Sequence, residues 1–182
     1  MINTSEVLRA IEYSIKAHDK QVRKYNGIPY ITHPVQVAWT MIRVCEMLNI
    51  EVTTEMVQSA ILHDTIEDCP KVTATEISIF FGDTVKRLVV GLTDTSKKTG
   101  LPRKERKELD KQRMKKQTIA VKTIKVFDIL RNCQDMCRDD KKYAVQYINE
   151  KLEFIPCLKG IHPSLYEMLE LELKSLLNTV DI

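Results

Sequence analysis

The chain lacks the features that mark membrane proteins, secreted proteins and β-sheet proteins. No apolar run approaches the roughly 20 residues of a transmembrane helix, and the first residues, Met1 to Glu6, contain no basic stretch followed by an apolar one. Glycine (5) and proline (6) are scarce, and alternating strand patterns flanked by turn dipeptides are absent apart from a turn at Asn26-Gly27. These absences predict a soluble, cytoplasmic and mostly helical protein.

The five cysteines form no disulfide or metal framework. Their number is odd, and their spacing fits neither paired half-cystines nor a zinc site. Cys133 and Cys137 lie four residues apart and could share a helix face around a metal, but two packed thiols explain this spacing better. We therefore expect reduced thiols and place no cysteine in the functional site.

Helical periodicity dominates the 182 residues, of which 43% are hydrophobic. This length fits one domain spanning residues 1–182, which can bury a core without disulfide or metal staples. We expect an all-α bundle of roughly eight to ten helices with a functional site in its core. The apolar spacing places these helices from Thr4 or Ser5 to before Asn26, from His33 through Val44, over Thr54 to Glu67, from a Thr73 cap to Gly82, from Asp83 through Val89, after Pro102, from Ile119 through Leu130, over Lys141 to Cys157 and over Pro163 to Asn178.

Positive charge gathers in one segment of the chain. The net charge of +3 is too small to indicate a nucleic-acid partner, and nothing indicates a membrane partner. Between Arg103 and Lys125, however, ten basic residues face three acidic ones. A solvated helix surface and a field that attracts a polyphosphate both explain this pattern. The segment gains functional meaning only if it borders a site.

One predicted helix ends in a cluster of ionisable residues. The stretch Ala60 to Asp68 begins as an apolar face and then contains His63, Asp64, Glu67 and Asp68. In a regular helix, His63 lies above Glu67 and Asp64 above Asp68. Burying an unpaired carboxylate costs several kcal/mol, so this cluster predicts a compensating positive charge nearby.

A divalent metal ion is the compensation that the residue types favour. An adjacent His and Asp offer only two ligands, so others must come from elsewhere in the chain. His33 and Asp128 are the candidates, because each is a polar residue in otherwise apolar surroundings. Each residue alone is more typical of a hydrogen-bonded structural position, but the four together form a mixed nitrogen and oxygen shell that suits an octahedral ion such as Mn²⁺.

Several stretches of the chain match a known family in order, from about residue 5 to residue 150. They include Gly27-Ile28-Pro29-Tyr30-Ile31-Thr32-His33-Pro34, Ala60-Ile61-Leu62-His63-Asp64-Thr65-Ile66-Glu67-Asp68, Leu92-Thr93-Asp94, and Lys125 through Asn132. In these stretches the chain resembles the HD-domain hydrolases of the RelA/SpoT group, and most closely the stand-alone small alarmone hydrolases.

This resemblance implies a fold, a cofactor and a reaction. The fold is an all-α HD domain, and the reaction is hydrolysis of the 3′-pyrophosphate of ppGpp or pppGpp, which gives GDP or GTP and pyrophosphate. The substrate partner is thus a small nucleotide, while the oligomeric state stays open. The metal, usually manganese, is implied to be held by His33, His63, Asp64 and Asp128.

The resemblance also implies roles for residues around the metal. Glu67 and Asp68 match the family's catalytic acidic pair, which orients the attacking water or moves its proton. The implied substrate contacts are Arg23 and Lys24 against the base, Asn132 at the base or sugar, Tyr147 in the nucleotide pocket, and the basic loop and helix that include Lys97 at the distal phosphates.

Two departures from the family pattern border the implied base pocket. Phe127 stands where a small residue is usual, and Arg131 where a His or Tyr is usual. They leave base selectivity open, so ppApp and NADPH are alternative substrates of an HD phosphohydrolase. A third alternative is a catalytically silent binding module that sequesters a nucleotide or a partner protein, but the presence of every metal ligand and of Glu67 disfavours it. A hydrolase could also act like an antitoxin that neutralises the product of an alarmone-making enzyme.

Overall fold

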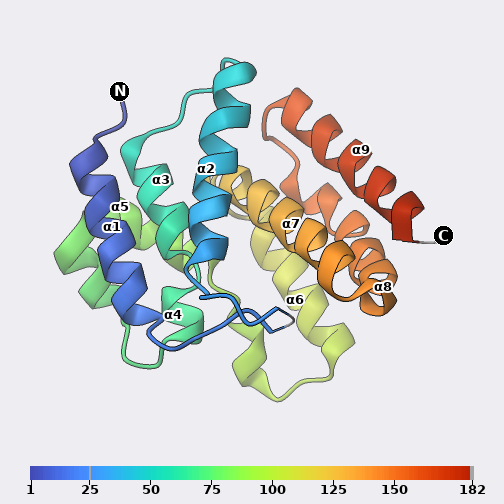
Figure 1. Cartoon of the computed structure of the whole chain (residues 1–182), viewed down its shortest axis with the longest axis horizontal. Helices are drawn as coiled ribbons and strands as arrows, with labels where there is room; N and C mark the ends of the chain where they lie inside the picture. The colour runs from blue at the N-terminus through green and yellow to red at the C-terminus, as the bar shows by residue number, and fades with distance from the viewer. Residues whose placement is uncertain (25, 181–182) are drawn as a thin grey trace.

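The protein is a helical bundle arranged around one central helix (Figure 1). The computed structural model describes residues 1–24 and 26–180, without the side chains of Lys97 and Lys98. Two short 3₁₀ turns, η1 (Ser96–Thr99) and η2 (Ile155–Leu158), accompany the α-helices. The nine α-helices of this described part are α1 (Thr4–Ala17), α2 (Thr32–Met47), α3 (Thr54–Leu62), α4 (Thr65–Asp68), α5 (Ala74–Leu92), α6 (Arg103–Lys115), α7 (Ile119–Asp139), α8 (Lys141–Leu152) and α9 (Pro163–Val180). The predicted all-α class is confirmed.

Helix α7 is the centre of the bundle. It packs against α2, α3 and α5 toward one side of the molecule and against α8 and α9 toward the other (Figure 1). Every residue from 121 to 130 is buried, including the charged residues Lys122, Lys125 and Asp128. Because buried charges are costly without partners, this helix must find compensating groups inside the core.

The helix predicted over Thr54 to Glu67 is interrupted at His63 and Asp64, which separate α3 from α4. Two side chains bind the backbone carbonyls at this point. The Thr65 hydroxyl donates to the Leu62 carbonyl at 2.7 Å, and Nδ1 of His63 donates to the Ala60 carbonyl at 2.8 Å. Such local bonds compete with the helical ladder, and they explain why the periodic pattern overestimated the length of this helix.

Two other predicted features, both in α5, agree with the structure, whereas the end of a later helix does not. The Thr73 hydroxyl caps α5 by accepting a hydrogen bond from the Glu76 amide at 3.1 Å. Gly82 adopts a positive φ of 87°, so α5 is kinked at the residue where a stop and restart were predicted. The last part of the predicted helix over Lys141 to Cys157 instead forms η2, separate from α8.

None of the described helices has the length and the apolarity needed to cross a bilayer.

Replacing Thr73 by Ala should lower the free energy of unfolding by about 1 kcal/mol, because it removes the N-cap of α5. Urea denaturation followed by circular dichroism measures this loss. Thr75→Ala is the matched control, because Thr75 is exposed in the first turn of the same helix and caps nothing. Equal stabilities of the two variants would contradict the assignment of the cap.

Candidate active site

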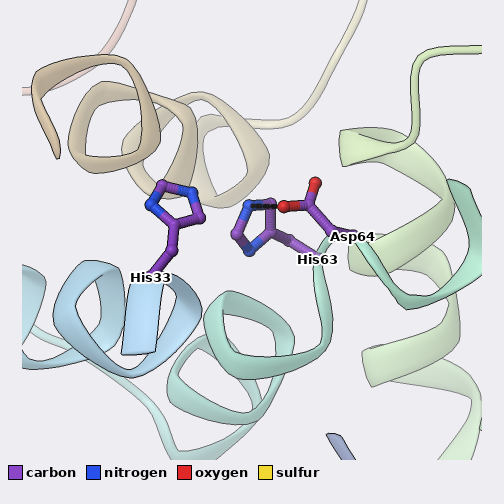
Figure 2. Close-up of side chains that lie close together, drawn as sticks. All are labelled: His33, His63 and Asp64. Carbon is purple, nitrogen blue, oxygen red and sulfur yellow. Dashed lines mark ion pairs between the residues drawn. The ribbon is translucent and has the colours of Figure 1, made fainter. Parts of the chain in front are cut away.

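Four side chains from α2, α7 and the junction of α3 and α4 converge in the core. His33 lies in the first turn of α2, and His63 and Asp64 follow the end of α3 (Figure 2). These three residues offer ligand atoms that all lie within 4.8 Å of one another. Asp128 of α7 completes the group, with Oδ1 at 3.3 Å from Nε2 of His33 and 3.6 Å from Nε2 of His63. The structure thus brings together all four residues predicted as metal ligands.

The imidazole of His63 is set to present a lone pair. Its Nδ1 donates to the Ala60 carbonyl, which leaves Nε2 as the ligand nitrogen of a neutral ring. Nε2 lies 2.9 Å from Oδ2 of Asp64, yet it makes no hydrogen bond, because the two groups are not aligned for one. The buried Nε2 and the carboxylate oxygen thus lie close together without a hydrogen bond. This arrangement is suited to binding a cation between them.

The electrostatics of the group also fit a cation. Burial lowers the pKa of His63, but the carboxylates of Asp64 and Asp128 outweigh burial and raise that pKa well above its usual value. Conversely, His63 holds the pKa of Asp64 low, and Lys125 holds that of Asp128 low, against the opposing effect of burial. The cluster therefore attracts a positive charge, and a divalent ion can take the place of the His63 proton.

Asp128 is held by two neighbours on its own helix. Nζ of Lys125 lies 2.9 Å from Oδ2, and the side-chain amide of Asn132 donates to Oδ1 at 2.6 Å. Asn132 in turn accepts a hydrogen bond from Arg23 at 3.2 Å. Partners of this kind fix the orientation of ligating carboxylates, so they connect the predicted metal site to the loop that contains Arg23.

Tyr30 connects the predicted metal site with the acidic pair. Its hydroxyl donates to Oδ2 of Asp64 at 2.6 Å and lies 3.4 Å from Oδ2 of Asp68. Burial and the two aspartates raise the pKa of Tyr30, so the phenol stays a donor at physiological pH. One phenol thus contacts both Asp64, the N-cap of α4, and Asp68, the last residue of that short helix.

Glu67, the other member of the acidic pair, is positioned by a distant segment. Its Oε2 accepts a hydrogen bond from the backbone amide of Asp94 at 2.7 Å. The Asp94 carboxylate is bound by Arg113 of α6 at 3.2 Å. The orientation of Glu67 thus depends on the chain that follows α5 and on α6.

Three of the predicted substrate residues gather in one pocket of about 310 Å³, namely Arg23, Lys24 and Asn132. Tyr30, Asp135 and other side chains complete its lining, and Arg23 donates to Asp135 at 2.9 Å. Tyr147 lies elsewhere, on α8, with its ring 6.1 Å from that of Tyr143 and next to Lys151. The side chain of Lys97, also predicted to contact substrate, lies outside the described residues.

Two supporting residues were not singled out from the sequence, namely Tyr30 and Lys125. Both were quoted only as parts of longer matching stretches. Each stands three residues before a predicted ligand, Tyr30 before His33 and Lys125 before Asp128. The spacing puts Lys125 on the same helix face as Asp128, which was a usable signal. Tyr30 instead acts on Asp64, 34 residues away, and no local pattern reveals that contact.

Replacing Tyr30 by Phe should weaken binding of Mn²⁺ to metal-stripped protein by about tenfold, because the donor that orients Asp64 is lost. Isothermal titration calorimetry measures the affinity directly. Tyr166→Phe is the control, since no hydrogen bond of the Tyr166 hydroxyl is found among the described residues. Unchanged affinity in the Tyr30 variant would show that Asp64 is oriented without the phenol.

The comparisons with known proteins agree with this geometry. A family model described as "HD domain" matches residues 10–152. The chain is 33% identical over 172 residues to human "Guanosine-3′,5′-bis(diphosphate) 3′-pyrophosphohydrolase MESH1", covering 91% of this chain and 92% of that protein. The zebrafish (Danio rerio) protein of the same name is 30% identical over 174 residues, with 92% of each chain covered.

Longer bacterial proteins and a solved structure are also similar. The chain is 33% identical over 171 residues to Escherichia coli "Bifunctional (p)ppGpp synthase/hydrolase SpoT", covering 88% of this chain but 22% of that protein. A structure described as "A metazoan ortholog of SpoT hydrolyzes ppGpp and plays a role in starvation responses" superposes with a TM-score of 0.79 at 23% identity, covering 98% of this chain and 97% of the other, which shows a shared fold. Matched along most of its length, the chain belongs to the HD-domain family and, within it, to the hydrolases that MESH1 and SpoT represent.

Proposed function

We propose that the protein is a manganese-dependent guanosine-3′,5′-bis(diphosphate) 3′-pyrophosphohydrolase, which acts in the cytoplasm and converts ppGpp and pppGpp into GDP or GTP and pyrophosphate. The convergence of His33, His63, Asp64 and Asp128 beside the acidic pair is the observation that carries this proposal. The names of the relatives supply the substrate.

Residues from α2, α7 and the junction of α3 and α4 would hold the metal ion. Two imidazoles and two carboxylates form a mixed nitrogen and oxygen set, which suits Mn²⁺ and leaves positions for water and a phosphate oxygen. When bound, the ion supplies a water of lowered pKa and polarises the phosphoryl group. Tyr30, Lys125 and Asn132 keep the two carboxylates in place for this task.

The acidic pair handles protons in this proposal. Glu67, oriented by the Asp94 amide, takes the proton of the attacking water. Asp68 lies within reach of the Tyr30 hydroxyl and provides a second carboxylate for passing the proton on toward the 3′ oxygen that leaves. Attack forms a bond from the water oxygen to the phosphorus next to the ribose, and the bond from that phosphorus to the 3′ oxygen breaks.

The pocket at Arg23 would hold the nucleoside. The Arg23 guanidinium lies 5.7 Å from the centre of the Tyr30 ring, and it also binds Asn132 and Asp135. A planar guanidinium fixed in this way offers a flat surface on which a base can stack. Because Asn132 contacts both Arg23 and Asp128, the base pocket adjoins the metal centre.

The function is tested by product identification. Incubation of the Mn²⁺-loaded protein with ppGpp should release GDP and pyrophosphate, and chromatography identifies both products. Parallel reactions with ppApp and NADPH test the alternatives left open by Phe127 and Arg131. Release of phosphate from NADPH alone would overturn the proposal, as would binding of ppGpp without turnover.

Replacing Glu67 by Gln should lower kcat for ppGpp by about a hundredfold or more, while KM changes little, because general-base catalysis typically contributes 10²–10⁴-fold. Steady-state kinetics at saturating Mn²⁺ separates the two parameters. Glu12→Gln removes the same charge from an exposed position on α1 and serves as the control. A Glu67 variant with the kcat of the parent protein would remove Glu67 from the mechanism.

A further inference from the structure

A second, smaller recess lies beside the metal centre, among α6, α7, α8 and the chain that follows α5. Its volume is about 40 Å³, which is room for about three water molecules or one phosphoryl group. Four lysines and four carboxylates contribute to its wall, together with one aromatic ring. The lining residues are Asp94, Lys107, Asp110, Lys111, Lys125, Glu150, Lys151, Glu153 and Phe154.

Two residues that line the recess contact residues of the proposed active site. Lys125 contributes to the lining, and its ammonium lies 2.9 Å from Oδ2 of Asp128. Asp94 contributes as well, and its backbone amide binds Glu67 at 2.7 Å. The recess therefore adjoins the proposed active site at Lys125 and Asp94.

Each carboxylate that lines the recess already has an ion-pair or hydrogen-bond partner. Arg113 binds Asp94, and the Ser96 hydroxyl donates to Asp110 at 2.9 Å. The remaining two also have cationic partners, Arg103 at 2.7 Å from Glu150 and Lys111 at 3.2 Å from Glu153.

Lys151 is different from the other lysines of the recess. It forms no ion pair with any carboxylate in the part of the chain that the structure describes, and its ammonium lies 5.0 Å from the ring centre of Tyr147 and 5.7 Å from that of Phe154. Burial, Lys125 and Lys107 together lower its pKa to about 8. An ammonium that is desolvated and close to other cations is stabilised by an incoming anion.

We propose that this recess receives the terminal phosphoryl group of the substrate's 3′-diphosphate, and that Lys151 selects a diphosphate over a phosphate monoester. This inference rests on the proposed function, in which the phosphoryl group next to the ribose is attacked at the metal centre. The terminal phosphoryl group is attached to it through one bridging oxygen. A recess beside the metal centre that contains the ammonium of Lys151, unpaired among the described residues, is where that second group can fit, whereas a monoester leaves the recess without a ligand.

A bound metal ion strengthens this role. Without an ion, Lys125 compensates the charge of Asp128. When Asp128 shares its charge with a cation, less of the Lys125 charge is neutralised, and Lys125 and Lys151 can bind one anion together. The recess is therefore expected to prefer a phosphoryl group most strongly in the metal-loaded protein.

Lys151→Met tests the proposal through three guanosine nucleotides that differ by one phosphoryl group. The parent compound has a diphosphate on both the 3′ and 5′ oxygens, the second has a 3′-monophosphate, and the third has a 5′-monophosphate. KM is measured for the two compounds with a 3′-diphosphate, and the inhibition constant is measured for the 3′-monophosphate. Lys142→Met, an exposed charge loss on the same helix, is the control.

We expect Lys151→Met to raise KM about ten- to hundredfold for both 3′-diphosphates, which is the effect of losing one charge-assisted contact. The inhibition constant of the 3′-monophosphate should stay within about twofold, a contrast that general misfolding cannot produce. Equal weakening of all three compounds, or no change, would overturn the role of Lys151. The role would also be overturned if Lys151→Met raised KM for the compound with two diphosphates but not for the one with a 5′-monophosphate. In that case the recess would hold the terminal phosphoryl group of the 5′-diphosphate. Failure of the unmodified protein to hydrolyse any 3′-diphosphate would instead overturn the proposed function.

Discussion

The structure depends on the compensation of one buried charge, the carboxylate of Asp128. Only 6% of this residue is exposed, in the fully buried part of α7. A carboxylate in such a position costs several kcal/mol unless cations and hydrogen-bond donors surround it. Two imidazoles, a lysine and an amide meet at this carboxylate, and they come from α2, the end of α3 and α7 itself. The same contacts that compensate the Asp128 carboxylate therefore join α2 and the end of α3 to α7 and also assemble the predicted metal site.

Much of this arrangement could be predicted because it depends on local sequence patterns. Apolar periodicity gave the helical class, Thr73 and Gly82 gave the start and the kink of α5, and isolated polar residues in apolar runs pointed to His33 and Asp128. Each of these signals depends on residues close together in the chain. Local chemistry also explains the one large error, since the side-chain bonds of His63 and Thr65 interrupt a helix that hydrophobicity alone extends.

The remaining features arise from contacts between distant segments. The hydrogen bonds from Tyr30 to Asp64 and from the Asp94 amide to Glu67 join residues that no helical period or motif spacing relates. Lys151 is a similar case, because its position on a predicted helix suggests a solvated surface. It is unusual only because α6, α7 and α8 enclose it, and that enclosure is a property of the tertiary structure.

The backbone amide that holds Glu67 belongs to the first residues after α5, where the chain turns toward η1. Every substitution of Asp94 except proline keeps the backbone N–H, so this support tolerates a change of side chain far better than a shift of the backbone. Loop grafting or circular permutation in this region should therefore leave the chain intact from Leu92 to Asp94 and place new termini beyond η1. For the same reason, an engineered hydrolase of this type must preserve the length of the connection between α5 and η1 more strictly than its amino-acid composition.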